Sequence, residues 1–255
     1  MITLYQFTIS QFCEKARWSL DHKGLIYKTE NLLPGTHAKK ALKVSSTTQL
    51  PILRHGLNHI QGSGKIIDYL DDHYQTRILT PADPVLKKEA TELELRLDAD
   101  LGLHLRRFFY TYMLQDMRQL KSLITLYGPW YSNNLYHLML PVIKKRMITD
   151  MKLNALEAER SRLIINNMLQ KLDEKLENRD YLVGDQFSRA DLTAAALLAP
   201  LCQPTQHPYY TPHLRLPHDL DEFQQRLKDR RFFQWAKGIY QKHRWEVKDA
   251  DSYRL

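Results

Sequence analysis

The chain has 255 residues, enough for one large domain or two small ones, and its apolar content of 43% is ordinary for a globular protein. It carries 37 basic and 29 acidic side chains, but the basic excess is spread along the chain and no run of five or six like charges occurs. Nucleic acid is therefore disfavoured as a partner, and a basic field that attracts anionic ligands is the simpler interpretation.

The cysteine content and the N-terminus indicate the compartment. Cys13 and Cys202 are the only two cysteines, too few for a disulfide framework or a zinc site. Residues 1–7 lack the basic start and the apolar stretch of a signal peptide, and no window approaches the ~18 apolar residues of a membrane-spanning helix. The sequence thus predicts a cytoplasmic protein with no metal site and no integral membrane segment.

The first 75 residues alternate between strand and helix signals. Residues 2–7 and 26–31 predict strands on either side of a helix at 11–23, a pattern that implies parallel pairing through a right-handed crossover. The order continues with a helix, two short strands and a final helix, predicted at 37–44, 51–54, 57–60 and 63–74. The result is β-α-β-α-β-β-α, the thioredoxin arrangement, with a four-stranded mixed sheet.

The second half of the chain predicts only helices. Pro81 and Pro84 mark a linker, and the Ser188–Asp191 spacing is typical of a capping box at a helix start. Helices are predicted at 84–119, 134–149, 152–177, 188–201, 219–227 and 230–241. We therefore expect a thioredoxin-like domain at 1–76, a linker at 77–84 and an all-helical bundle domain at 85–248.

Five motifs in this order resemble the cytosolic glutathione transferases over about residues 1–245. Ser-Gln-Phe-Cys at 10–13 is similar to a theta-class motif, and residues 12–17 are similar to an omega-class string. Gln-Leu-Pro at 49–51 looks like the family's Gln-Val-Pro. The third helix opens with Ser-x-x-Ile-x-x-Tyr-Leu at 63–70, and residues 181–192 match the family's C-terminal motif. Residues 12–20 and 33–37 also resemble bacterial transferase-like proteins of undefined substrate.

The resemblance implies a site for glutathione, a thiol tripeptide that reacts as its thiolate. Ser10 precedes a helix N-terminus, which favours anions, and its hydroxyl would stabilise the sulfur; the alternative is a plain helix cap. Leu50 would pair its backbone with the cysteinyl unit beside a cis Pro51. Ser63 would bind the γ-glutamyl carboxylate. The implied glutathione-binding residues are Phe12, Cys13, His37, Lys40, Gln49, Leu50, Pro51, Gly62 and Ser63.

Two positions leave the function open. Gly62 stands where the family usually has an acidic or amide side chain, so one polar contact to glutathione is missing or displaced. Cys13 forms a Ser-x-x-Cys pattern that lacks the exposed leading thiol of a redox pair, and its simplest role is that of a small buried residue. A binding or assembly protein without transferase activity, and a thiol transferase that uses Cys13, therefore stand as alternatives to a glutathione transferase.

A small hydrophobic electrophile is expected as second substrate, between the domains. Phe7, Thr8, Arg107, Tyr110 and Met113 are the candidate residues, although such stretches are more often core than pocket. The segment 120–151 would enlarge the pocket, cover it or contact a membrane surface. The resemblance also implies a homodimer that pairs the region around 67–71 with that around 89–96.

Overall fold

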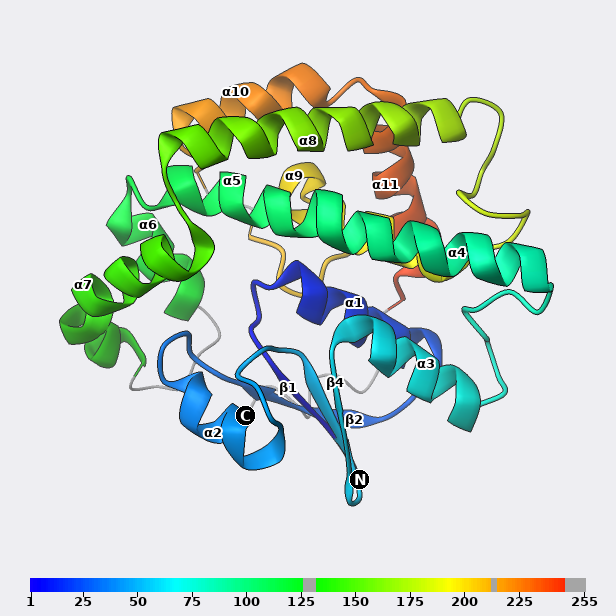
Figure 1. Ribbon diagram of the computed structural model, residues 1–255, viewed down its shortest axis with the longest axis horizontal. Helices are drawn as coiled ribbons and strands as arrows, with labels where there is room; N and C mark the ends of the chain where they lie inside the picture. The colour runs from blue at the N-terminus through cyan, green and yellow to red at the C-terminus, as the bar shows by residue number, and fades with distance from the viewer. Residues whose placement is uncertain (126–131, 212–214, 246–255) are drawn as a thin grey trace.

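The computed structural model describes residues 1–125, 132–211 and 215–245 and shows a small sheet beneath a larger helical region (Figure 1). The sheet has the strand order β2-β1-β3-β4. β1 pairs parallel with β2 and antiparallel with β3, which pairs antiparallel with β4. The predicted four-stranded mixed sheet is confirmed. Its strands are β1 (Ile2–Gln6), β2 (Tyr27–Asn31), β3 (Ile52–His55) and β4 (Asn58–Gln61).

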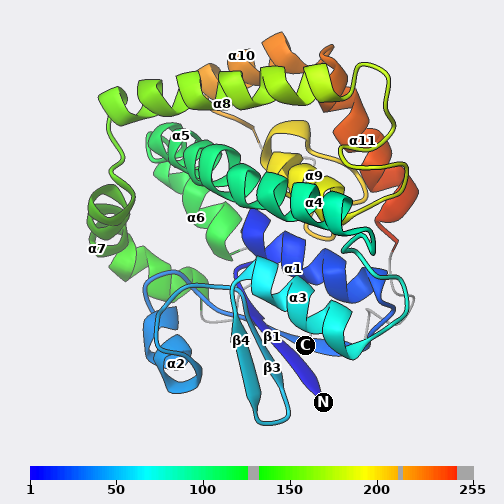
Figure 2. The same cartoon turned by 45° about the vertical axis from the view of Figure 1, so that its right-hand side comes forward.

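Three helices cover the two faces of this sheet. Alternate residues of β1 point to opposite faces, so Leu4 packs with Leu20 and Ile66, whereas Tyr5 packs with Ala41. The first face carries the two helices that meet the helical region, and the second carries a single helix at the edge of the molecule (Figures 1 and 2). These are α1 (Gln11–His22) and α3 (Ser63–His73) on the first face, and α2 (His37–Val44) on the second.

The second half of the chain is helical, and no strand occurs after β4 in the part of the chain that the structure describes. Ser188 and Asp191 form the predicted capping box, and the Asp191 carboxylate also accepts from the Leu182 N–H at 2.7 Å. None of the described helices is long and apolar enough to cross a membrane. The helices are α4 (Pro84–Arg96), α5 (Leu103–Met113), α6 (Met117–Thr125), α7 (Ser132–Met151), α8 (Ala155–Lys175), α9 (Arg189–Cys202), α10 (His218–Leu227) and α11 (Arg231–His243).

The predicted helix at 84–119 is wrong as a single element. A π-helical segment, η1 (Leu97–Gly102), separates α4 from α5, and a new helix starts after Asp116, whose carboxylate accepts from two backbone N–H groups. At Gly102 the helix lies so close to α1 that an added Cβ would be 2.7 Å from Cζ of Phe12. The close approach of α1 thus coincides with the change in helical pitch.

Ion pairs join the two halves of the chain at a buried position. Lys15 of α1 lies 2.6 Å from Glu94 of α4 and 2.8 Å from Asp98 of η1. Arg189 of α9 also binds Glu94 and lies 2.6 Å from Asp68 of α3. These contacts fix α1 and α3 against the helical region, and therefore fix the position of the loop that precedes α1.

Candidate functional site

Three of the predicted site segments emerge at one edge of the sheet. Ile52 of β3 lies opposite Tyr5 near the end of β1 and opposite Gln61 at the end of β4. Since the chain leaves β1 and β4 at this edge and enters β3 there, Ser10, Pro51 and Ser63 lie on the same side of the domain. The sheet register thus brings together the residues that the resemblance groups as a glutathione site.

Ser10 is the N-cap of α1. Its Oγ accepts a hydrogen bond from the Cys13 backbone N–H at 3.3 Å, with extended backbone angles (φ −82°, ψ 121°). A hydroxyl carries two acceptor lone pairs and one donor hydrogen, so capping leaves the hydrogen free. The cap and the donation of a hydrogen bond to a bound thiolate are therefore compatible roles for one side chain.

Cys13 is fully buried and lies in the first turn of α1. Its Sγ accepts from the Phe7 backbone N–H at 3.4 Å. Burial raises the pKa of the Cys13 thiol, with Arg17 acting in the opposite direction. A neutral, inaccessible thiol is poorly suited to exchange with a substrate disulfide, so the geometry disfavours the thiol-transfer alternative.

We expect both thiols to be unreactive in the folded protein, because Cys202 is also buried. Titration with a chromogenic disulfide reagent should show no rapid phase in buffer and two thiols per chain after denaturation in guanidinium. If one thiol reacted in the native state at the rate of a free cysteine, this result would support the thiol-transferase alternative that uses Cys13.

The loop before β3 contains the predicted cis bond, between Leu50 and Pro51. Leu50 is half-buried, and its backbone N–H and C=O have no hydrogen-bond partner among the described residues. The neighbouring Gln49 carbonyl accepts from Nε2 of Gln61 at 2.7 Å. The loop thus presents one backbone donor and one acceptor, as an added peptide strand requires.

Gly62 precedes the first residue of α3 and provides no side chain that could bind glutathione. Gly62 has φ +99°, in the region that favours glycine, and its N–H donates to the Pro51 carbonyl at 3.0 Å. The preceding Gln61 cannot substitute for the missing side chain, because its amide binds Ser45, Thr47 and Gln49. Ser63, only 5% exposed, begins the helix beside this turn.

The predicted cations of α2 are partly engaged elsewhere. Lys40 is exposed and forms an ion pair with Glu30 of β2. Nδ1 of His37 accepts from the Gly35 N–H at 3.2 Å, and its ring packs edge-on against Phe7 with centroids 4.8 Å apart. Desolvation lowers the pKa of His37, so a neutral imidazole is favoured at this position.

The second-substrate candidates divide into two groups. Phe7 and Tyr110 are half-buried, as is the neighbouring Phe12 at the start of α1, whereas Met113 is fully buried in the helical core. Arg107 faces away, because it donates to the Met151 carbonyl at 3.0 Å and pairs with Glu157 of α8 at 3.6 Å. The structure does not place Arg107 or Met113 at an open site.

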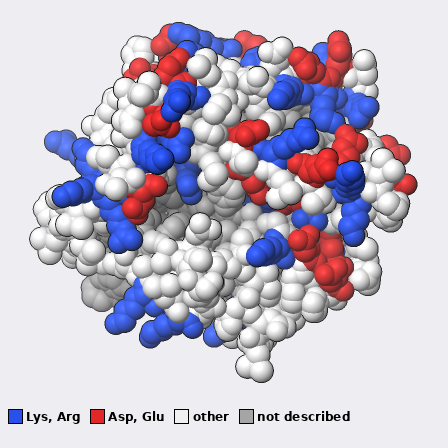
Figure 3. Space-filling view, in the orientation of Figure 1, with Lys and Arg blue, Asp and Glu red and all other residues white. Residues whose placement is uncertain are grey.

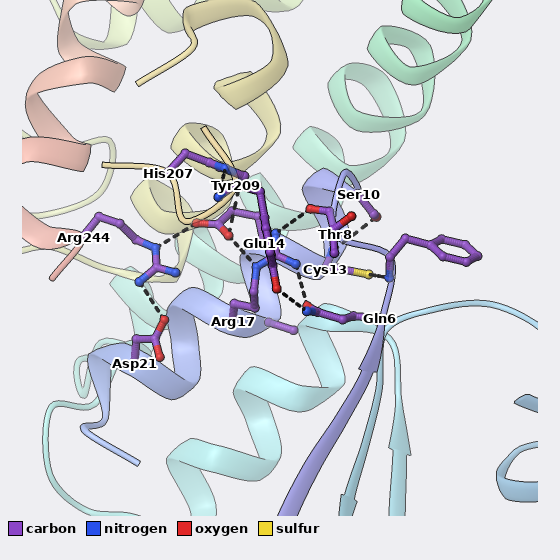
Figure 4. Close-up of polar contacts among 12 residues, drawn as sticks. Gln6, Thr8, Ser10, Cys13, Glu14, Arg17, Asp21, His207, Tyr209 and Arg244 are labelled. Atoms are coloured by element: carbon purple, nitrogen blue, oxygen red, sulfur yellow. Dashed lines mark hydrogen bonds and ion pairs between the residues drawn. The ribbon is translucent and has the colours of Figure 1, made fainter. Parts of the chain in front are cut away.

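Thr8 has a structural role that the sequence does not reveal. Its side chain is buried, and its carbonyl accepts from Arg17 at 3.2 Å, two residues before Ser10 (Figure 4). The Arg17 guanidinium also donates to Gln6 at 2.5 Å and lies 4.8 Å from the ring centroid of Tyr209. The loop that carries Ser10 is therefore fixed by a buried cation.

Glu14 is the centre of this buried cluster. Its two carboxylate oxygens accept from Arg17 and Arg244, each at 2.8 Å, and Arg244 also pairs with Asp21 at 2.7 Å (Figure 4). Burial opposes ionisation, but Arg244, His207 and Arg17 hold the pKa of Glu14 at about 2. Burial lowers the pKa of His207 to about 4, so its imidazole is neutral at neutral pH and the arginines balance the carboxylate.

The sequence did not predict this cluster. Glu14 and Arg17 stand three residues apart, the spacing of an ordinary exposed helical pair, and nothing local indicates burial. Arg244 lies 230 residues from Glu14 in sequence. A weak signal was available, since Gln6 is a polar residue on the face of a strand that lies against α1.

Comparison with known proteins agrees with this architecture. Residues 4–78 match the family described as "Glutathione S-transferase, N-terminal domain", and residues 135–208 match "Glutathione S-transferase, C-terminal domain". A glutathione S-transferase of Pseudomonas putida F1 is 27% identical over 106 residues, which are 42% of this chain and 48% of that protein. The match thus spans about half the length of the curated relative.

Solved structures show the same fold at low sequence identity. The β-etherase LigF of Sphingobium sp. SYK-6 superposes with a TM-score of 0.63 at 19% identity, covering 94% of this chain and 99% of that one. A Methylobacterium radiotolerans glutathione S-transferase, solved in complex with glutathione sulfonate, gives 0.57 at 20% identity, covering 91% of this chain and 92% of that one.

Proposed function

Because this chain belongs to the cytosolic glutathione transferase superfamily, we propose that it binds glutathione and activates the thiolate for attack on an apolar electrophile. The observation that carries the proposal is the convergence of Ser10, Leu50 and Ser63 at one edge of the sheet. Ser63 and the free N–H groups of α3 would bind the γ-glutamyl carboxylate, and the Leu50 backbone the cysteinyl unit.

The reaction requires a deprotonated sulfur. The glutathione thiol gives its proton to solvent, and the Ser10 hydroxyl donates a hydrogen bond to the remaining thiolate, aided by the N-terminus of α1. The thiolate attacks an electrophilic carbon that bears a halogen. A carbon–sulfur bond forms, the carbon–halogen bond breaks, and the halide leaves with the electron pair of that bond. Phe7, Phe12 and Tyr110 supply the apolar surroundings for the electrophile.

The alternative of a binding or assembly protein rests on Gly62. With no side chain at this position and with the Gln61 amide engaged, the γ-glutamyl group has fewer partners. A missing hydrogen bond to a charged group costs roughly 1.5–3 kcal/mol. Glutathione binding is therefore the property that separates the two functions.

We expect saturating glutathione to raise the midpoint of thermal unfolding by several degrees. At a concentration of about 100 times Kd, binding adds ~2.7 kcal/mol of stability, and each kcal/mol shifts Tm by roughly 2–4 °C in a chain of this size. Cysteinylglycine, which lacks the γ-glutamyl group, serves as the matched control and should give no shift. A midpoint that glutathione leaves unchanged would favour the binding or assembly function.

We also propose that the protein forms a homodimer. Fewer residues of the predicted regions 67–71 and 89–96 are available for the contact than the sequence suggests. Within residues 67–71, Ile67 and Leu70 are buried in their own subunit, and Asp71 pairs with Lys23 at 2.7 Å. Asp68 remains exposed in this stretch of α3, and Leu95 is exposed on α4. These exposed positions are the ones that a second copy would contact.

A further inference from the structure

One face of α5 and the preceding turn is directed at the start of α1. Residues four apart on a helix lie on the same side, so Gly102, Arg106 and Tyr110 form one row. At the first of these, Nε2 of Gln11 donates to the Gly102 carbonyl at 2.6 Å, and the absence of a Cβ allows contact with Phe12. The row therefore begins at the contact with Gln11 and Phe12, the two residues that follow Ser10.

The third member of the row lies near the same place. Burial raises the pKa of the Tyr110 phenol to about 12, and the neighbouring titratable groups that act on it are Arg106 and Cys13. Cys13 is the residue whose N–H is capped by Ser10. Tyr110 therefore lies near the first turn of α1, and Arg106 lies one helical turn before it on the same row.

Arg106 differs from its neighbour Arg107 in lacking a hydrogen-bond or ion-pair partner among the described residues. Arg107 is engaged with α8, whereas Arg106 forms no hydrogen bond or ion pair with any residue that the structure describes. The Arg106 side chain is exposed, yet surrounding protein desolvates it enough to lower the pKa of its guanidinium. Arg106 is therefore a guanidinium that a ligand can reach and that no described side chain pairs with.

Figure 3 shows that this face of the molecule is hollowed below α5, with Lys and Arg as well as Asp and Glu side chains around the hollow. An arginine stays protonated at all physiological pH values and presents several donors in a planar fork suited to a carboxylate. A charge of this kind beside half-buried aromatic rings matches a ligand with an apolar body and one anionic end.

We propose that Arg106 binds a carboxylate on the second substrate, so that the enzyme selects aromatic or other apolar electrophiles that carry a negative charge. This inference rests on the proposed glutathione chemistry, because the electrophile is placed by its distance from the bound sulfur. Phe12 and Tyr110 contact the apolar part, and the guanidinium of Arg106 pairs with the carboxylate. A neutral electrophile of the same shape makes the first contacts but leaves Arg106 unpaired.

The test measures binding and does not depend on turnover. Two glutathione conjugates serve as probes, S-(4-carboxy-2,6-dinitrophenyl)glutathione and its 4-carboxamide, which differ only in the charge of one substituent. S-methylglutathione reports on the peptide site alone. Calorimetric titrations use the full-length wild type, Arg106→Gln and a control, Arg179→Gln, which removes an exposed arginine from the turn after α8.

We expect the wild type to bind the carboxylate about 10- to 100-fold more tightly than the amide, as a hydrogen-bonded charge pair predicts. In Arg106→Gln the two conjugates should bind with equal affinity, because only the affinity for the carboxylate falls. The affinities for the amide and for S-methylglutathione should not change. Arg106→Lys should retain part of the ratio, and Arg179→Gln should retain all of it.

Two results would overturn the inference without affecting the proposal that the protein binds glutathione. The first is that the wild type binds both conjugates with equal affinity. The second is that Arg106→Gln loses affinity for all three ligands by the same factor. The second result would assign Arg106 to a carboxylate of the peptide. Failure of S-methylglutathione to bind the wild type would instead overturn the proposed function, and this inference with it.

Discussion

Replacement of Glu14 by glutamine should destabilise the protein by about 3–5 kcal/mol, the cost of removing one partner from a buried ion pair. Both Arg17 and Arg244 are 2% exposed and share this carboxylate, so the substitution leaves an uncompensated positive charge away from solvent. With roughly 2–4 °C per kcal/mol, the thermal midpoint should fall by about 6–20 °C. Circular dichroism during heating and urea unfolding measure the effect.

The matched control is Glu222→Gln, which removes the same group from an arginine pair on the surface of α10. The side chains of Arg226 and Glu222 in this pair are 65% and 49% exposed. Exposed ion pairs of this kind contribute about 1 kcal/mol or less to stability. A double variant, Glu14→Gln with Arg244→Met, should lose less stability than the sum of the two single changes, because it removes the charge that the first change leaves unpaired. Equal effects for Glu14→Gln and Glu222→Gln would contradict the buried cluster.

The same carboxylate predicts a pH dependence. The pKa of Glu14 falls from 4.5 to about 2 in the folded protein, so folding is linked to loss of its proton. Its contribution to the free energy of unfolding is complete above about pH 4.5 and disappears as the pH falls towards 2. The stability difference between wild type and Glu14→Gln should therefore narrow over this acidic range.

The N-terminal half of the fold was predictable because its signals are local. The alternation of strand and helix signals over residues 1–75 depends on neighbours in sequence, and the structure has a strand or helix for each of the predicted ones. Pro51 is cis as expected, although only the family resemblance, and no local pattern, indicated it.

What the sequence did not show depends on distant contacts. The π-helical segment that ends at Gly102 lies against Gln11, which is 91 residues away in sequence. Helical periodicity cannot predict that contact. The buried cluster of Glu14 likewise needs Arg244 from the far end of the described chain. Local propensity predicts each helix but not which polar side chains the packing encloses.

The candidate site shows how a shift of one position changes a role. Successive residues of an α-helix are about 100° apart, so Arg106 and Arg107 face different directions. Sequence reasoning selected Arg107, whose guanidinium binds α8. The contact of Gly102 with Gln11 and Phe12 identifies which side of α5 lies against the start of α1.

Replacement of Ser10 by alanine should lower kcat/KM by about 10- to 100-fold near neutral pH. A hydrogen bond to a charged group is worth roughly 1.5–3 kcal/mol, and ~1.4 kcal/mol corresponds to a factor of ten in rate. Without the hydroxyl, the pKa of the bound glutathione thiol should rise towards the ~8.5 of a free thiol. The affinity for the peptide should change little, because Leu50 and Ser63 make the proposed contacts to it.

The pH profile of conjugation with any reactive electrophile measures this effect. The difference between wild type and Ser10→Ala should shrink as the pH rises above the thiol pKa, since hydroxide then generates the thiolate without help. Ser10→Thr retains both the cap and the hydroxyl and should keep most of the activity.

Ser10→Gly separates catalysis from helix capping, which are combined in one oxygen atom that accepts from the Cys13 N–H. Glycine at an N-cap costs only a few tenths of a kcal/mol relative to serine, whereas alanine costs about 1 kcal/mol. If the hydroxyl acts on the thiolate, Ser10→Gly and Ser10→Ala should lose activity equally while only the alanine variant loses appreciable stability. If Ser10→Gly instead keeps the wild-type pH profile, Ser10 is a cap alone, and the thiolate must be stabilised by backbone N–H groups at the start of α1.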